Sequence, residues 1–197
     1  YAGAFVYSKF GTDITNSYRE YLEVPLVTSL TPGQKYLVSF YVSRAEYFGQ
    51  AIANIGAKFM PLAYTIYGPP SNLYSGVLDF FTPPDVVNSP SNVITDSTNW
   101  TLIQGVYTAI GFENHLLLGN FKDDPNTPAT FVGGQNTNYA YYYFDNVSVV
   151  AICDPEMTNK VVQCGTPWQF SPFPVIDNCS GGNITVCRMC HVQTSGG

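Results

Sequence analysis

A five-residue motif near the C-terminal end of the sequence has the most specific chemical meaning. Cys187, Arg188, Met189, Cys190 and His191 follow one another with the spacing C-x-x-C-H. In this spacing two thiols can bond to the vinyl groups of a haem, and the histidine that follows can bind the iron as an axial ligand. The motif therefore predicts a c-type haem on Cys187 and Cys190 with His191 as iron ligand, and electron transfer as the function.

The same cysteines have two other interpretations. All five cysteines of the chain lie at or after Cys153. In the first, either Cys187 or Cys190 forms a structural disulfide with Cys153, and a second disulfide in the segment leaves one thiol of the five free or bound to another chain. In the second, cysteine and histidine side chains bind a metal ion. The short stretch after His191 and the lack of a helical pattern around it favour disulfides. Export to an oxidising compartment suits both haem attachment and disulfides, which predicts an extracellular or cell-surface protein.

Asp145 is the second residue with a chemical interpretation. The alternation of the segment places its carboxylate on the same strand face as Tyr141, Tyr143 and other apolar residues. If that face is buried, an unpaired carboxylate has a large desolvation cost, and Ca²⁺ with further oxygen ligands is one solution. The alternative is that Asp145 accepts hydrogen bonds from backbone amides at the end of a strand.

Aromatic side chains in or beside the expected loops form a third set of candidates. Sugar rings present flat C–H faces that pack on aromatic rings, while their hydroxyls bond to amides and carboxylates. The alternative for each of these rings is a place in the core, where most aromatic residues of a sandwich lie. The candidates for binding a glycan or another cell-surface polymer are Tyr47, Phe48, Tyr64, Tyr67 and Tyr74.

Other classes of function have less support in the sequence. Residues 1–150 contain one histidine, His115, and no cysteine, and no pattern selects a catalytic pair among the acidic residues, so we expect a protein that is not an enzyme. A net charge of −6 predicts no nucleic-acid partner. The longest apolar runs stop well short of the ~18 residues that suggest a membrane span.

Period-2 alternation indicates β-strands throughout the first part of the chain. Tyr36, Val38, Phe40 and Val42 alternate with more polar residues, and no stretch has a convincing helical period. Long loops are expected at 60–99 and 122–138, where binding residues are common. The pattern predicts an all-β, antiparallel sandwich in which strands occupy 18–27, 36–42, 51–59, 100–110, 115–121 and 139–150.

The first 150 residues contain a series of characteristic phrases: YAGAFVYSK, YREYLEVPL, LTPGQKYLVSFYVSRAE, AIANIGAKF, TDSTNWTLIQGVYTAIGFENHLLLGNFKDD and YYYFDNVSVV. In order and spacing they resemble a family of jelly-roll, galactose-binding-like domains in large secreted proteins of the Bacteroidetes type. The resemblance implies an antiparallel jelly-roll sandwich over 1–150, related to carbohydrate-binding modules, in many of which the aspartate matching Asp145 holds a structural Ca²⁺.

Residues 151–197 look like the beginning of a hyalin-repeat-like, immunoglobulin-type module, on the phrase CGTPWQFSPFPVIDNCSGGNITV. This second resemblance implies a disulfide between Cys164 and Cys179 in a small, partial β appendage. Domains of the first family also open with an earlier strand like Asn-Pro-Ser-Phe-Glu, which this sequence lacks. We therefore expect a fragment of a longer protein, or a sheet completed by a neighbouring chain at an exposed edge.

These observations predict a non-catalytic binding or adhesion module of an extracellular or cell-surface protein, which recognises a glycan. The alternatives are a subunit of an extracellular fibre or surface layer that self-assembles through sheet edges, and a haem protein for electron transfer.

Overall fold

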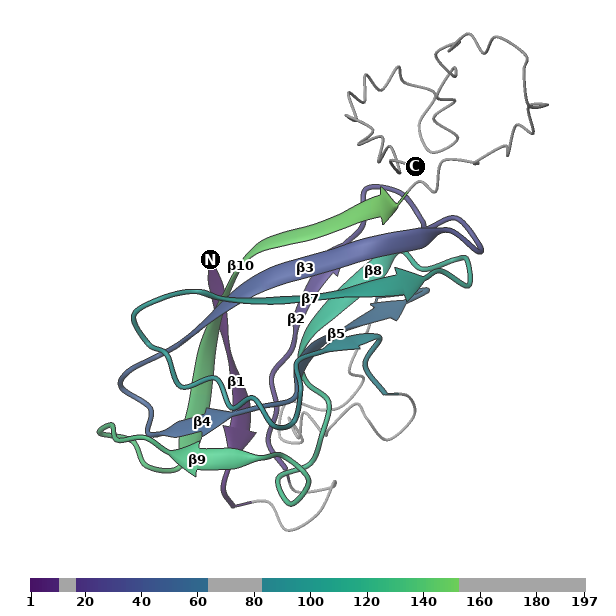
Figure 1. The fold of residues 1–197 in the computed structure, drawn as a ribbon. Helices are drawn as coiled ribbons and strands as arrows, with labels where there is room; N and C mark the ends of the chain where they lie inside the picture. Colours follow the sequence, from purple (N-terminus) through teal and green to yellow (C-terminus); the bar gives the residue numbers. More distant parts are fainter. Residues whose placement is uncertain (11–16, 64–82, 153–197) are drawn as a thin grey trace, which may run out of the picture. The chain divides into compact units, whose positions relative to one another are not determined.

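A computed structural model of the chain describes residues 1–10, 17–63 and 83–152 (Figure 1). The chain divides into two compact units, Tyr1–Ile152 and Cys153–Gly197. All the residues of the haem, disulfide and Cys/His metal predictions lie outside the described residues, and so do three of the aromatic candidates. The first group is Cys153, Cys164, Cys179, Cys187, Cys190 and His191, and the second is Tyr64, Tyr67 and Tyr74.

The described residues form strands and no helix, as the sequence predicts. The strands pair antiparallel in two four-stranded sheets, β1-β10-β3-β7 (sheet A) and β2-β8-β5-β6 (sheet B), and in one small pair, β4-β9. No helix in this part of the chain is long and apolar enough to cross a membrane. The strands are β1 (Ala2–Ser8), β2 (Leu22–Pro25), β3 (Lys35–Arg44), β4 (Gln50–Ile52), β5 (Ile55–Met60), β6 (Val86–Val87), β7 (Thr101–Thr108), β8 (His115–Asn120), β9 (Ala129–Phe131) and β10 (Tyr139–Ile152).

One hydrophobic cluster joins the inner faces of the two sheets. In β3 the expected alternation is confirmed, because Val38, Phe40 and Val42 are fully buried while the residues between them face outward. Sheet B contributes Ile55 and Leu118, among others, to the same cluster. Two antiparallel sheets that share a core in this way form a sandwich.

The strand predictions fail mainly at short or interrupted elements. The expected strand at 51–59 is divided into β4 and β5, because Asn54 adopts a left-handed conformation with φ of 62°. Two strands lie inside segments that were expected to be loops, β6 in 60–99 and β9 in 122–138, and β1 was not predicted. β6 has 2 residues and β9 has 3, which is too short for a period-2 pattern.

An irregularity interrupts the long last strand. The register of β10 against β3 shifts between Asp145 and Ser148, and Asn146 has a positive φ of 49°. This is a β-bulge, which bends a strand and redirects its side chains. Before the bulge Tyr139, Tyr141 and Tyr143 face outward, opposite the buried Ala140, Tyr142 and Phe144.

Candidate functional site

The outer face of sheet A carries a connected group of aromatic rings, here called the aromatic strip. Its rings come from the residue before β1, from β1 and β10, and from three connecting segments, and each ring is in contact with at least one other. Its members are Tyr1, Phe5, Phe10, Tyr18, Tyr47, Phe48, Trp100, Tyr139, Tyr141 and Tyr143.

One end of the aromatic strip lies around Tyr1. The centroid of its ring lies 6.3 Å from that of Trp100 and 5.2 Å from that of Tyr143. Tyr143 in turn lies 5.6 Å from Tyr141, with the planes of the two rings inclined at 73°. Edge-to-face pairs of this kind stabilise one another and leave parts of the ring faces available to a ligand.

The other end lies around Phe48, which stacks on Tyr141 with centroids 5.5 Å apart and planes inclined at 21°. Phe5 packs edge-on against both rings, at 5.1 Å and 4.9 Å. Tyr47, which is 53% exposed, contacts Phe48 from the solvent side. Segments that are far apart in the sequence therefore meet in one surface.

A glycine in β1 allows this arrangement. Gly3 pairs with Tyr143, and a Cβ atom added to Gly3 would lie 2.4 Å from the Cε1 and hydroxyl atoms of the Tyr141 ring. No side chain fits in that space unless the ring moves. Glycine at this position therefore lets Tyr141 lie flat across β1.

A buried arginine holds the turn that carries Tyr47 and Phe48. The guanidinium of Arg44 donates hydrogen bonds to the backbone carbonyl of Phe48 at 2.6 Å and to that of Thr95 at 3.0 Å. The peptide N–H of Arg44 also donates to the carbonyl of Asp96 at 3.0 Å. These bonds link the Tyr47–Phe48 turn to the segment that leads to Trp100.

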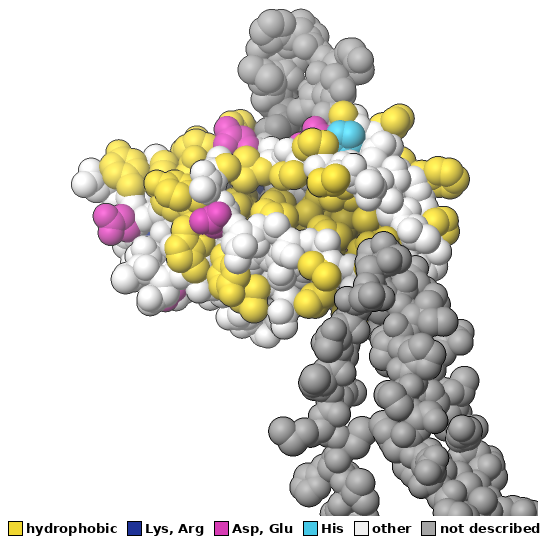
Figure 2. Space-filling model, turned by 90° about the horizontal axis from the view of Figure 1, so that it is seen from above, with side chains coloured by type: hydrophobic (Ala, Val, Ile, Leu, Met, Phe, Trp, Pro, Cys, Tyr) yellow, Lys and Arg dark blue, Asp and Glu magenta, His cyan; other side chains and the backbone are white. Residues whose placement is uncertain are grey.

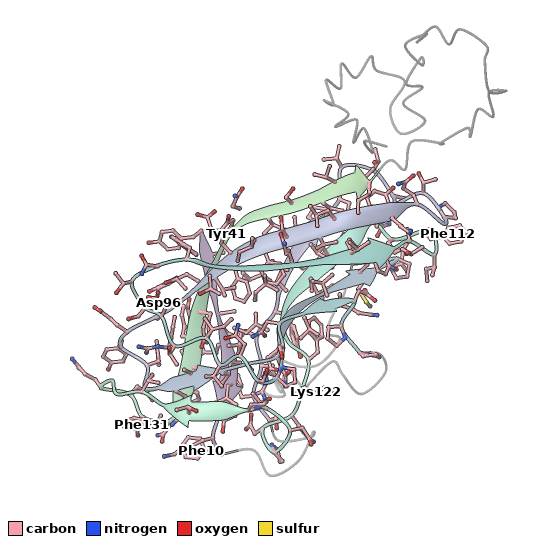
Figure 3. All side chains as sticks on the ribbon, in the orientation of Figure 1. Phe10, Tyr41, Asp96, Phe112, Lys122 and Phe131 are labelled. Atoms are coloured by element: carbon pink, nitrogen blue, oxygen red, sulfur yellow. The ribbon has the colours of Figure 1, made fainter. Side chains whose placement is uncertain are left out.

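Asp96 shapes the turn immediately before Trp100. Its Oδ1 accepts hydrogen bonds from the backbone N–H groups of Thr98, at 2.7 Å, and Asn99, at 2.9 Å. The bond from Asn99, followed by that from Thr98, lowers the pKa of Asp96 below its usual range. Figure 3 shows Asp96 in a loop beside the strands, whereas Tyr41 lies on β3.

Burial and a nearby carboxylate raise the pKa of two tyrosines of the strip, Tyr18 and Tyr141. The hydroxyl of Tyr18 donates to Oε1 of Glu20 at 2.7 Å, and burial together with this bond raises the pKa of Tyr18 to about 12. Burial and the charge of Glu20 also raise the pKa of Tyr141. Both hydroxyls therefore remain protonated at neutral pH and can donate hydrogen bonds.

Asp145 is exposed, so the expectation that it is buried is wrong. Its side chain is 51% exposed on the same face as Tyr141 and Tyr143, because that face points to solvent. Its Oδ1 accepts a hydrogen bond from the N–H of Asn146 at 2.7 Å, as in the alternative interpretation, but at the bulge within β10 and not at the end of a strand. Within residues 1–10, 17–63 and 83–152 no three His, Cys, Asp or Glu side chains are grouped to hold a metal ion. Calcium at Asp145 stays a prediction.

Two acidic residues that could serve in catalysis are engaged in structural contacts. Asp124 pairs with the buried Arg19, and Oε1 of Glu113 accepts from the Tyr107 hydroxyl at 2.6 Å. The latter bond, with backbone N–H groups, lowers the pKa of Glu113 although burial acts to raise it. Both carboxylates thus serve as fixed acceptors within the fold.

Sequence reasoning identified part of the aromatic strip. Tyr47 and Phe48 lie in it, but the expectation that loops alone would carry the rings missed those on β1 and β10. The alternation of Tyr139, Tyr141 and Tyr143 with buried residues was the available signal. Figure 2 shows one face of the molecule on which hydrophobic side chains gather, with acidic side chains among them.

Comparison with known proteins adds no relative. No model of a known protein family matches the chain, and no curated protein matches it. The proposal of a function therefore depends on the geometry of the surface.

Proposed function

We propose that the unit Tyr1–Ile152 is a non-catalytic glycan-binding module of an extracellular or cell-surface adhesion protein, built as a jelly roll. The observation that carries this proposal is the aromatic strip. It places the exposed rings of Tyr1 and Trp100 at the end that carries the carboxylate of Asp145, and the exposed ring of Tyr47 at the other end, with tyrosine side chains between them. Rings for the apolar faces of sugars and acceptors for their hydroxyls are the two elements that a sugar site requires.

The charge around the aromatic strip supports a ligand without strong negative charge. Glu20 and Asp145 lie at the strip, and Glu46 precedes Tyr47. Carboxylates repel acidic polymers but accept hydrogen bonds from neutral sugar hydroxyls. The net charge of the whole chain, −6, also disfavours an acidic ligand.

The test is affinity electrophoresis of the full chain in gels that contain soluble neutral polysaccharides, with Trp100→Ala, Tyr47→Ala and the unchanged protein. Removing either ring is expected to weaken binding about tenfold or more without lowering the melting temperature, since exposed aromatic anchors dominate such contacts. Phe112→Ala is the matched control, because it removes an exposed ring at a distant loop (Figure 3). The proposal is refuted if the gel retards all variants as much as the unchanged protein, or if it does not retard the unchanged protein at all.

A structural role is the second candidate, favoured by β7. Within the described residues this strand is at the edge of sheet A, pairs only with β3, and contains no proline or charged residue over Thr101–Thr108. Natural edge strands usually carry such residues to prevent pairing with other chains. Addition of a strand from a neighbouring subunit at β7 would produce large sedimenting species, and Val106→Lys should dissolve them.

A further inference from the structure

A second exposed apolar surface lies in the loop between β7 and β8. The side chains of Ile110 and Phe112 are 79% and 80% exposed. Val27 is fully exposed in the adjacent segment, where Leu26 and Leu30 donate backbone hydrogen bonds to the carbonyls of Asn114 and Glu113. We call these three residues the apolar tip. Figure 3 shows Phe112 projecting from the end of the strands opposite to Asp96 and Phe131. The apolar tip is thus separate from the aromatic strip.

The backbone of the tip is held in an unfavourable conformation. Phe112 has a φ of 78°, and Gly111 before it has a φ of 96°. A bulky residue other than glycine rarely adopts a left-handed conformation, and such strain persists only where surrounding contacts impose it. Phe112 gains no burial in return. This combination marks a side chain that is displayed for a purpose other than stability.

Glu113 supplies the contacts that impose the conformation. Its Oε1 accepts from the N–H of Ile110 at 2.7 Å and from the Tyr107 hydroxyl at 2.6 Å, while its backbone carbonyl accepts from the N–H of Leu30 at 2.9 Å. The side chain is buried, and its second oxygen has no partner among the described residues. Glu113 therefore ties the tip loop to β7 and to the segment that carries Val27.

The chemistry around the tip indicates what it contacts. Residues 26–33 and 109–112 contain no Lys, Arg, Asp or Glu. A specific protein interface has a polar rim with hydrogen bonds, and an anionic membrane would require basic residues. Glu113, which is buried, and Lys35, which pairs with Thr108, flank these segments, but the segments themselves carry no charge. Apolar side chains that protrude from uncharged segments suit an uncharged lipid interface, where acyl chains accept them without a matching pocket.

We propose that the apolar tip inserts into the surface of a zwitterionic lipid bilayer and anchors the module there. Phe112 and Ile110 are the inserted side chains, Val27 lies beside them, and Glu113 is the positioning residue. The protein's net charge of −6 makes phosphatidylcholine, rather than an acidic lipid, the expected surface. The proposal is independent of glycan binding by the aromatic strip.

The test is sedimentation of the full chain with vesicles of pure phosphatidylcholine. The unchanged protein should partition to the vesicles, and the double variant Ile110→Ala/Phe112→Ala should lose at least tenfold in partition. Trp100→Ala, which removes a ring from the strip, should sediment like the unchanged protein. In Phe112→Trp the fluorescence of the new side chain should shift to the blue when vesicles are added.

A further variant separates insertion from a structural role of the ring. Phe112→Gly removes the ring and relieves the left-handed strain, so its melting temperature should equal or exceed that of the unchanged protein while vesicle binding is lost. The proposal is overturned if the unchanged protein stays in the supernatant, or if the double variant binds equally well. It is also overturned if only phosphatidylserine vesicles bind, or if the tip variants abolish a dimer instead.

Discussion

Arg19 and Asp124 form an ion pair in the interior, with Nη1 and Oδ1 2.6 Å apart and both side chains almost fully enclosed. The guanidinium also donates to the carbonyl of Lys122, at 2.7 Å from Nη2, and lies 5.5 Å above the centre of the Tyr7 ring. The segment before β2 is thus fixed to the loop after β8. The fold tolerates this buried pair because the opposite charge and the charge-assisted hydrogen bonds compensate for the loss of water around both groups.

Removing one member of this pair should be strongly destabilising. We expect Asp124→Ala to lower the free energy of unfolding by about 3–5 kcal/mol, because the arginine remains buried without its counter-charge. Urea unfolding measures the change. The neighbouring Asp123, which accepts from the N–H of Asn126 at 3.1 Å, provides the control, and Asp123→Asn should cost less than about 1 kcal/mol. Similar losses of stability in both variants would contradict the role of Asp124 as the counter-charge of Arg19.

The buried hydroxyl of Tyr142 should also contribute to stability. It donates to the carbonyl of Ile94 at 2.5 Å and accepts from the N–H of Ile52 at 3.0 Å. Tyr142→Phe leaves both backbone groups buried without this partner, which should cost about 1–3 kcal/mol. Tyr143→Phe changes an outward hydroxyl on the same strand and should have almost no effect. Thermal unfolding of the two variants and of the unchanged protein measures these losses. A Tyr142→Phe protein as stable as the unchanged protein would contradict the prediction.

The Glu113 carboxylate should make the tip loop sensitive to acid. Its pKa is lowered in the folded protein from an ordinary value of 4.5, because its hydrogen bonds outweigh the opposing effect of burial. The stabilisation is then complete above about pH 4.5 and is lost as the pH falls through the lower folded value. The urea midpoints of the unchanged protein and Glu113→Gln should differ most at pH 7, and the difference should shrink as the pH is lowered below 4.5. A constant difference would argue against the lowered pKa.

A methyl group at Gly3 should disturb the aromatic strip more than the fold. The added carbon would meet the outer end of the Tyr141 ring, which can turn toward solvent at small cost. We expect Gly3→Ala to lower glycan affinity several-fold while the melting temperature changes little. Gly33→Ala is unsuitable as a control because its φ is 77°, so Ala2→Val, at an exposed neighbouring position of β1, is used instead. If Gly3→Ala has the same glycan affinity as the unchanged protein, Tyr141 is not part of the binding surface.

The C-x-x-C-H motif makes a prediction that concerns covalent chemistry alone. If Cys187 and Cys190 carry haem, the native protein has an added haem mass and a Soret band that survives extraction with acid acetone, because thioether bonds do not break. If the cysteines form disulfides, the protein is colourless and its mass is lower only by the hydrogens lost on oxidation. Mass spectrometry and an absorption spectrum of the same sample distinguish these outcomes.

The sequence predicted the regular parts of the fold because strands buried on one face show the pattern directly. Val38, Phe40 and Val42 are an example, and the all-β class follows from such runs. The face of Asp145 was predicted to be buried, since a row of tyrosines looks like core; only the three-dimensional structure shows that the row faces solvent. The contact of Tyr141 with Phe48 depends on how segments far apart in the chain meet, which no local pattern contains.

The pairing of β1 with β10 determines when the domain can be completed during synthesis. Residues 2–8 bond to residues 139–144, and β10 also lies between β1 and β3 in sheet A. Until the last strand has left the ribosome, the first has no neighbour in its sheet, and the apolar inner side chains of β1 have no partner strand to hold them. The nascent chain must therefore keep β1 unpaired until residues 139–144 have been synthesised, a period in which a chaperone would protect β1 from association with other chains.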